Sequence, residues 1–183
     1  MLKKYTISEH LKTIDQNAKV TAKEVNMLIS RIRNKFRRNG LVKSAENDKL
    51  IREYIDMIFD TQDRRCSFWL PVEEGEINGI WNGPQKSGWV TKNILYEVDH
   101  VNPVNAGGTD SLTNFQFLSA NANQFTKCSL PISLLLKRKD LSIELKDRIK
   151  SVLKKREDLF NSDKWKDYVD RVKAFENKQL KEV

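Results

Sequence analysis

The chain has 183 residues, and its two cysteines are too few for a disulfide framework or for a four-cysteine zinc site. An excess of 33 lysines and arginines over 25 aspartates and glutamates gives a net charge of +8, which favours partners with negative charge, above all nucleic acid. No apolar run has the length of a membrane span or of a secretory signal, so we expect a soluble, cytoplasmic protein that has no membrane partner.

The charge divides the chain into three regions. Residues 1 to 65 carry 15 basic and 9 acidic side chains, residues 66 to 127 carry 3 and 6, and residues 128 to 183 carry 15 and 10. The middle region also holds six of the seven glycines. We therefore predict a basic helical region over residues 1 to 65, a core with the chemistry over 66 to 130, and a second basic helical region over 131 to 183.

The first region predicts two amphipathic helices. Thr21 and Glu24 have the spacing of a capping box, and apolar side chains recur at helical spacing from Val25 to Phe36, before Gly40. A second apolar stripe runs from Leu50 to Phe59. The polar side of the first helix is strongly basic, which predicts contacts with the DNA backbone, although a merely solvated helix face is the alternative. The basic residues are Arg31, Arg33, Lys35, Arg37 and Arg38.

The sequence of the middle region predicts a strand, a loop, a second strand and a helix, in that order. Residues 94 to 99 alternate in character as a strand does, residues 114 to 118 form a second short strand, and Ser119 can cap a helix that runs toward Lys127. Between residues 73 and 90 lies a glycine-rich insert with Trp81 and Trp89, for which we expect packing over the core, with DNA contact as the alternative.

The last region is again helical. Leu145, Ile149 and Val152 fall at helical spacing, and a final helix is expected to carry Trp165, Tyr168, Val169, Val172 and Phe175. Because these aromatic residues share one helical stripe, we expect them in the core or in an interface rather than as stacking platforms for bases.

Several residues of the middle region occur together in a known pattern. They are Asp99-His100 at a strand end, Pro103, the Gly107-Gly108 turn followed by Thr109-Asp110, Asn114 at the start of the second strand, and Asn123 nine residues later. This pattern resembles the HNH endonuclease motif of the ββα-metal superfamily, over about 30 of the 183 residues. The resemblance implies an α+β fold in which a ββα-metal core is flanked by N- and C-terminal helical segments.

The resemblance also implies a role for each motif residue. Asp99 corresponds to a metal ligand, His100 to the general base, Asn114 to the asparagine that ties the loop, and Asn123 to the second metal ligand, with Asn121 as the alternative. In relatives, a phosphate-binding lysine stands one position before that of Lys127. The resemblance therefore implies a role in DNA binding for Lys127, which is displaced by one residue from the family position. Ideal strand geometry would put Asp99 and His100 on opposite faces, so we expect the pair where the strand gives way to the loop.

The chemistry of these residues suits phosphodiester hydrolysis. A histidine with an ordinary pKa near 6.5 can deprotonate water at neutral pH, and His10, the other histidine, is remote in sequence from the motif. One carboxylate and one amide oxygen match Mg²⁺ or Mn²⁺ better than zinc. Structural zinc is not expected, because Ser119 and Ala122 stand where relatives have knuckle cysteines.

We therefore expect a metal-dependent endonuclease of the restriction or homing type that acts on double-stranded DNA, encoded by a phage or mobile element. A homodimer would be one way to cut both strands. The alternative from another class is a non-catalytic, basic DNA-binding or assembly protein that has an HNH-like core. The intact set of Asp99, His100, Asn114 and Asn123 favours the enzyme.

Overall fold

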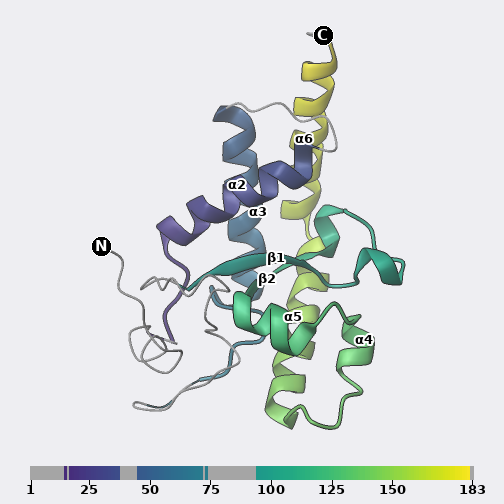
Figure 1. Ribbon diagram of the computed structural model, residues 1–183. Coiled ribbons are helices and arrows are strands. Elements are labelled where there is room, and N and C mark those ends of the chain that lie inside the picture. The colour runs from purple at the N-terminus through teal and green to yellow at the C-terminus, as the bar shows by residue number, and fades with distance from the viewer. Residues whose placement is uncertain (1–14, 16, 38–44, 72, 74–93, 182–183) are drawn as a thin grey trace.

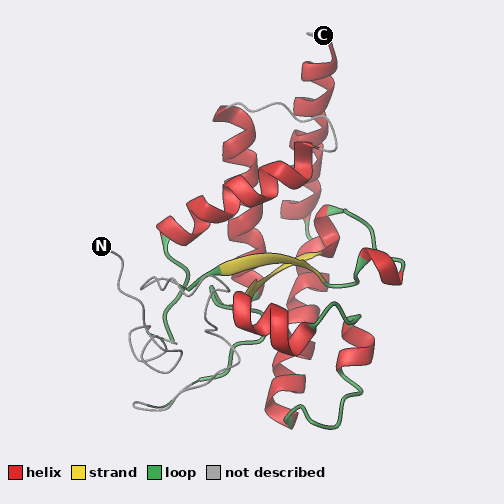
Figure 2. Ribbon diagram, viewed as in Figure 1, coloured by secondary structure: helices red, strands yellow, loops and turns green. Residues whose placement is uncertain are grey.

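The computed structural model describes residues 15, 17 to 37, 45 to 71, 73 and 94 to 181 (Figure 1). These residues form a mostly helical protein with one small antiparallel sheet, which confirms the expected combination of helices and strands (Figure 2). No helix in the described part is both long and apolar enough to cross a membrane. Residues 74 to 90 of the insert, with Trp81 and Trp89, lie outside the described residues, and so do His10, Arg38 and Gly40. The elements are α2 (Ala22–Arg37), α3 (Ala45–Thr61), β1 (Tyr96–His100), η1 (Val104–Ala106), η2 (Leu112–Asn114), β2 (Phe115–Ser119), η3 (Ala122–Lys127), α4 (Ile132–Leu135), α5 (Ile143–Phe160) and α6 (Asp163–Lys181).

Helix α2 begins at the capping box that the sequence predicts. The backbone N–H of Thr21 donates to Oε2 of Glu24 at 2.7 Å, and the N–H of Glu24 donates to Oγ1 of Thr21 at 3.3 Å. The other carboxylate oxygen of Glu24 accepts from the N–H of Ile94 at 2.8 Å. Glu24 is buried, so one side chain both caps α2 and ties this helix to the segment that enters β1.

The three regions of the sequence share one hydrophobic core. Phe59 of α3, Phe117 of β2 and Leu145 of α5 belong to the same buried cluster. Trp165 and Tyr168 of α6 join this cluster, with ring centroids 6.3 and 6.4 Å from that of Tyr54, and Phe175 is also buried. This confirms the prediction that the aromatic stripe of the last helix belongs to the core.

Strands β1 and β2 form an antiparallel ribbon whose first face packs against α3. The register pairs Tyr96 with Ser119 and His100 with Phe115. On this face the ring of Phe59 lies 4.7 Å from that of Phe117 and 5.1 Å from that of Tyr96. Because alternate strand residues share a face, Tyr96, Val98 and His100 point to this side, whereas Glu97 and Asp99 point to the other.

The second face of the ribbon is covered by the segment that follows β2. Ser119 caps its start, with Oγ accepting from the N–H of Ala122 at 3.3 Å, as the sequence predicts. The expected helix is present, but η3 is a π-helix, a form that is often associated with functional sites. It ends at Cys128, which has a positive φ of 47° and whose N–H donates to the carbonyl of Asn123 at 3.0 Å. Lys127 and Asn123 of η3 both contact β1.

Candidate active site

His100 is the last residue of β1, and its side chain is 18% exposed. Its Nε2 lies 2.5 Å from Oδ1 of Asp110, and its ring centroid lies 5.0 Å from that of Phe115. Both residues are still paired in the sheet, Asp99 with Gln116 and His100 with Phe115, and His100 is the last residue of β1. The expectation that both residues leave the strand is therefore corrected: they point to opposite faces of the ribbon.

The side chain of Asn114 clamps the loop that joins the two strands. Its Oδ1 accepts from the N–H of Asn102 at 2.9 Å, and its Nδ2 donates to the carbonyls of Asn102 and Thr109, both at 2.8 Å. Asn102 lies two residues after His100, and Thr109 lies next to Asp110. One amide group therefore holds the two ends of the loop together, which is the loop-tying position that the sequence assigned to Asn114.

Replacing Asn114 with alanine should loosen this loop. Three hydrogen bonds are lost, and at about 1 kcal/mol each we expect the free energy of unfolding to fall by about 2 to 3 kcal/mol. Amide hydrogen exchange should quicken at Asn102, whose N–H loses its acceptor. The neighbouring Thr113→Ala, which removes an exposed hydroxyl bonded only to Ser111 at 3.2 Å, serves as the control. Equal exchange at Asn102 in both variants would contradict the clamp.

The glycine pair of the loop is required by its geometry. Gly107 has a φ of 85°, a conformation that favours glycine. A Cβ on Gly108 would lie 1.8 Å from the carbonyl oxygen of Asn102, which is a backbone atom that cannot move away cheaply. The loop thus folds back against its own start, next to the end of β1.

Side chains from two helices donate hydrogen bonds to the backbone of this loop. The hydroxyl of Tyr54 in α3 donates to the carbonyl of Leu112 at 2.6 Å, and Nη2 of Arg156 in α5 donates to the carbonyl of Thr113 at 3.0 Å. Arg156 is buried, and burial lowers the pKa of its guanidinium. Both contacts immediately precede Asn114, so the helical regions fix the position of the clamp.

Asp99 lies on the other face of the ribbon, beside a buried cation. Its Oδ2 accepts from Nε2 of Gln116 at 2.8 Å and lies 3.5 Å from Nζ of Lys127. The Asp99 side chain is 12% exposed and that of Lys127 is fully buried. Burial raises the pKa of Asp99, which Lys127 partly counteracts, and burial lowers the pKa of Lys127. The ammonium of Lys127, for which the resemblance implies a contact with DNA, faces Asp99 instead of solvent.

Asn123 also faces β1, with Nδ2 donating to Oε2 of Glu97 at 2.8 Å. Glu97 is a site residue that the sequence analysis missed, although its position two residues before Asp99 places both carboxylates on one face. Among the described residues, no cluster of three or more histidines, cysteines, aspartates or glutamates is arranged to hold a metal ion.

The oxygens of Asp99 and Asn123 nevertheless have the chemistry that Mg²⁺ prefers. The buried Nζ of Lys127 lies 3.5 Å from Oδ2 of Asp99 and makes no hydrogen bond within the described part of the chain, so this face already holds a positive charge next to Asp99. Asp99 offers a carboxylate and Asn123 an amide to a divalent ion, and such an ion would have to share Asp99 with the ammonium of Lys127.

The basic residues of α2 are partly engaged within the protein. Nη1 of Arg31 donates to the carbonyl of Tyr96 at 2.8 Å, and Arg33 forms an ion pair with Asp48 of α3. Both side chains are half-buried. The side chains of Lys35 and Arg37 lie outside the described part of the structure, as does all of Arg38. The expected basic face is therefore described only in part, and its two described members also bind the protein itself.

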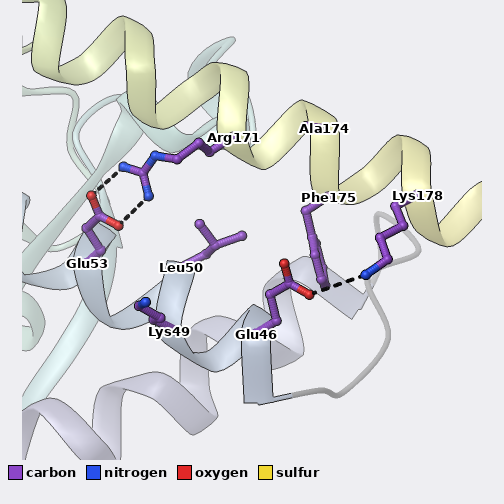
Figure 3. Close-up of a pocket in the computed structure, with 8 residues that line it drawn as sticks. All are labelled: Glu46, Lys49, Leu50, Glu53, Arg171, Ala174, Phe175 and Lys178. Atoms are coloured by element: carbon purple, nitrogen blue, oxygen red, sulfur yellow. Dashed lines mark hydrogen bonds and ion pairs between the residues drawn. The ribbon is translucent and has the colours of Figure 1, made fainter.

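A separate pocket lies between α3 and α6, with a volume of about 400 Å³ (Figure 3). Arg171 bridges across it to both carboxylate oxygens of Glu53, at 2.6 and 2.8 Å, and Lys178 lies 4.0 Å from Glu46. The hydrogen bonds from Arg171 hold the pKa of Glu53 below its ordinary value. Two ion pairs, Arg171 with Glu53 and Lys178 with Glu46, thus join α3 and α6 across this pocket, and none of the motif residues lines it.

Comparisons of the chain with protein-family models, with curated proteins and with solved structures gave no match. Function is therefore inferred from the residues and their geometry.

Proposed function

We propose that this protein is a metal-dependent DNA endonuclease of the HNH type, with a ββα-metal core between its helical regions. The observation that carries the proposal is the clamp made by Asn114, which ties the loop beside His100 to the loop beside Asp110. Three hydrogen bonds from one half-buried amide fix the backbone on both sides of the histidine and aspartate, which is more than a connecting loop between two short strands requires. The order of strand, loop, strand and helical segment also agrees with this assignment.

His100 is the proposed general base. Its ring lies where β1 ends and the loop begins. A neutral imidazole can take a proton from a water molecule that attacks the scissile phosphodiester. The hydrolysis then leaves a 5′-phosphate and a 3′-hydroxyl. The net charge of +8 supports a polyanionic substrate, and we propose double-stranded DNA as cut by restriction or homing enzymes.

Asp99 and Asn123 are the proposed ligands of a magnesium or manganese ion. Both lie where η3 covers the ribbon, and each offers an oxygen atom. Because Asp99 and His100 point to opposite faces of the ribbon, a divalent ion held there would supply positive charge to a scissile phosphate, and to its departing 3′ oxygen, that lies across the end of β1. Gln116 orients the Asp99 carboxylate through its hydrogen bond to Oδ2.

One observation favours the non-catalytic alternative. The ammonium of Lys127 lies 3.5 Å from Asp99 and provides a counter-charge to this carboxylate without a metal ion. A basic DNA-binding protein that keeps an HNH-like core would have this arrangement, so the two functions must be separated by experiment.

The test is incubation of supercoiled plasmid with the full chain in the presence of Mg²⁺, Mn²⁺ or EDTA. We expect conversion to nicked or linear DNA with either metal ion and none with EDTA, because the leaving group then lacks its counter-charge. Circular dichroism in EDTA checks that removal of the metal ion does not unfold the protein. Retardation of the plasmid in a gel without any cleavage, across plasmid, linear duplex and single strands, would reject the enzyme and favour the DNA-binding alternative.

A further inference from the structure

The contact between His100 and Asp110 distinguishes the two nitrogens of the imidazole ring. A neutral imidazole has one donor nitrogen and one acceptor nitrogen, and an ionised carboxylate only accepts hydrogen bonds. Because Oδ1 of Asp110 lies 2.5 Å from Nε2, that nitrogen must carry the proton. The lone pair of the neutral ring is then on Nδ1.

We propose that Asp110 is a positioning residue that holds His100 in the Nε2–H form, so that Nδ1 is the atom that accepts the proton from water. The inference rests on the proposed nuclease function and specifies the atom at which the proton moves. In the proton transfer, the O–H bond of the attacking water breaks, Nδ1 gains the proton, and the imidazolium that results has a negative charge beside its Nε2–H. Asp110 thus stabilises the charge that forms on His100 without taking the proton itself.

The surroundings of His100 are consistent with this assignment of its two nitrogens. Among the described residues no hydrogen bond uses Nδ1, and the side chain remains 18% exposed, so water has access to the ring. The side chain of Asp110 is 42% exposed, so its carboxylate is partly hydrated. Phe115 lies beside the imidazole and limits its rotation.

The clamp of Asn114 accounts for the short distance between these two side chains. Asn114 holds the carbonyl of Thr109, next to Asp110, and both backbone groups of Asn102, near His100. His100 and Asp110 are ten positions apart in the sequence. The clamped backbone of the loop brings their side chains together, so the contact does not depend on two flexible surface side chains. Such a pair loses less side-chain entropy than an ordinary exposed one.

The experiment compares the wild type with Asp110→Asn by ¹⁵N-resolved nuclear magnetic resonance of the histidine ring and by steady-state kinetics. The spectra are recorded at about pH 9, where an ordinary histidine is neutral. His10→Gln assigns the signals, because the chain has only two histidines. In the wild type we expect a slowly exchanging, low-field proton on Nε2. In Asp110→Asn this proton should exchange rapidly and part of the population should shift to the Nδ1–H form, because an amide can also donate to Nε2.

In the cleavage assay, Asp110→Asn should lower kcat by about 10-fold to 100-fold, while KM changes by less than about twofold. Asp147→Asn on α5 removes the same charge from a side chain that is 62% exposed and should leave both the spectrum and kcat unchanged. Asp110→Ala, which removes every hydrogen-bonding group, should also lose the Nε2 signal.

Three outcomes separate the inference from the proposed function. An Nε2 proton and a kcat that are both unchanged in Asp110→Asn would overturn the inference, whatever the wild type does to DNA. Loss of the Nε2 proton together with lower kcat supports it. Loss of the Nε2 proton in a protein whose wild type never cleaves DNA supports the contact of Asp110 with His100 but overturns the nuclease.

Discussion

Replacement of His100 with alanine is expected to lower the rate of plasmid cleavage by about 1,000-fold, within the range that general base catalysis contributes. The substitution removes the only imidazole in the candidate site, while Asp99, Asn114 and Asn123 remain. Because His100 lies at the end of β1 and is partly exposed, its removal leaves little cavity, and the melting temperature should change little. The measurement is a time course of nicking under excess enzyme, which reports the chemical step and not product release.

The matched control is His10→Ala, which removes the other histidine of the chain. This variant should cleave at the wild-type rate, because His10 is not part of the motif. If both variants cleave as the wild type does, the activity comes from elsewhere and His100 is not the base. If His100→Ala loses activity only because it no longer binds DNA, a gel-retardation assay will reveal this.

Replacement of Lys127 with methionine is expected to lower the free energy of unfolding by about 3 kcal/mol, the usual cost of breaking a buried ion pair. Methionine fills a similar volume but leaves the carboxylate of Asp99, which is 12% exposed, without a counter-charge. Urea denaturation at neutral pH measures the difference. Lys150→Met on α5 is the control, because that lysine is 61% exposed and its pair with Asp147 contributes little.

A second measurement on the same variant tests the proposed metal site. If a divalent ion binds Asp99, it can replace the charge that the ammonium of Lys127 provided. Added Mg²⁺ should therefore raise the melting temperature of Lys127→Met more than that of the wild type, through preferential binding to the folded state. The double variant Lys127→Met with Asp99→Asn should recover part of the stability and lose the response to Mg²⁺. An equal response in all three proteins would remove Asp99 from the metal site.

Local features of the fold could be predicted well from the sequence. The capping box at Thr21 and Glu24, the stripe that buries Tyr54 and Ile58, and the cap at Ser119 all act between residues within a few positions of one another. The loop-tying role of Asn114 was implied by the resemblance of the middle region to the HNH motif, and its three side-chain hydrogen bonds agree with that role.

Contacts between distant segments could not be predicted in the same way. Arg31 reaches Tyr96 across 65 positions, and Arg156 reaches Thr113 across 43. A basic residue on a polar helix face has the same pattern whether it faces solvent or a carbonyl group of another element. Lys127 illustrates the difficulty, because only the π-helical turn of η3 directs this lysine to Asp99 and not outward.

Within the candidate site, the sequence placed His100 but not its partner. Asp110 stands in the quoted motif, yet spacing alone does not tell which loop carboxylate will meet the imidazole. Glu97 was missed for a similar reason, since its contact with Asn123 depends on how η3 lies over the ribbon. Both contacts arise from the packing of the hairpin and not from a local pattern.

The motif depends on the helical regions that precede and follow it in the sequence. The β-ribbon buries Phe117 against Phe59 of the N-terminal region, and the loop beside His100 is held by Arg156 of the C-terminal region. Residues 66 to 130 alone would lose the apolar partners of one sheet face and the support of the clamp. We therefore expect residues 66 to 130 not to fold as an independent unit, because the motif depends on contacts with the helical regions on both sides of it in the sequence.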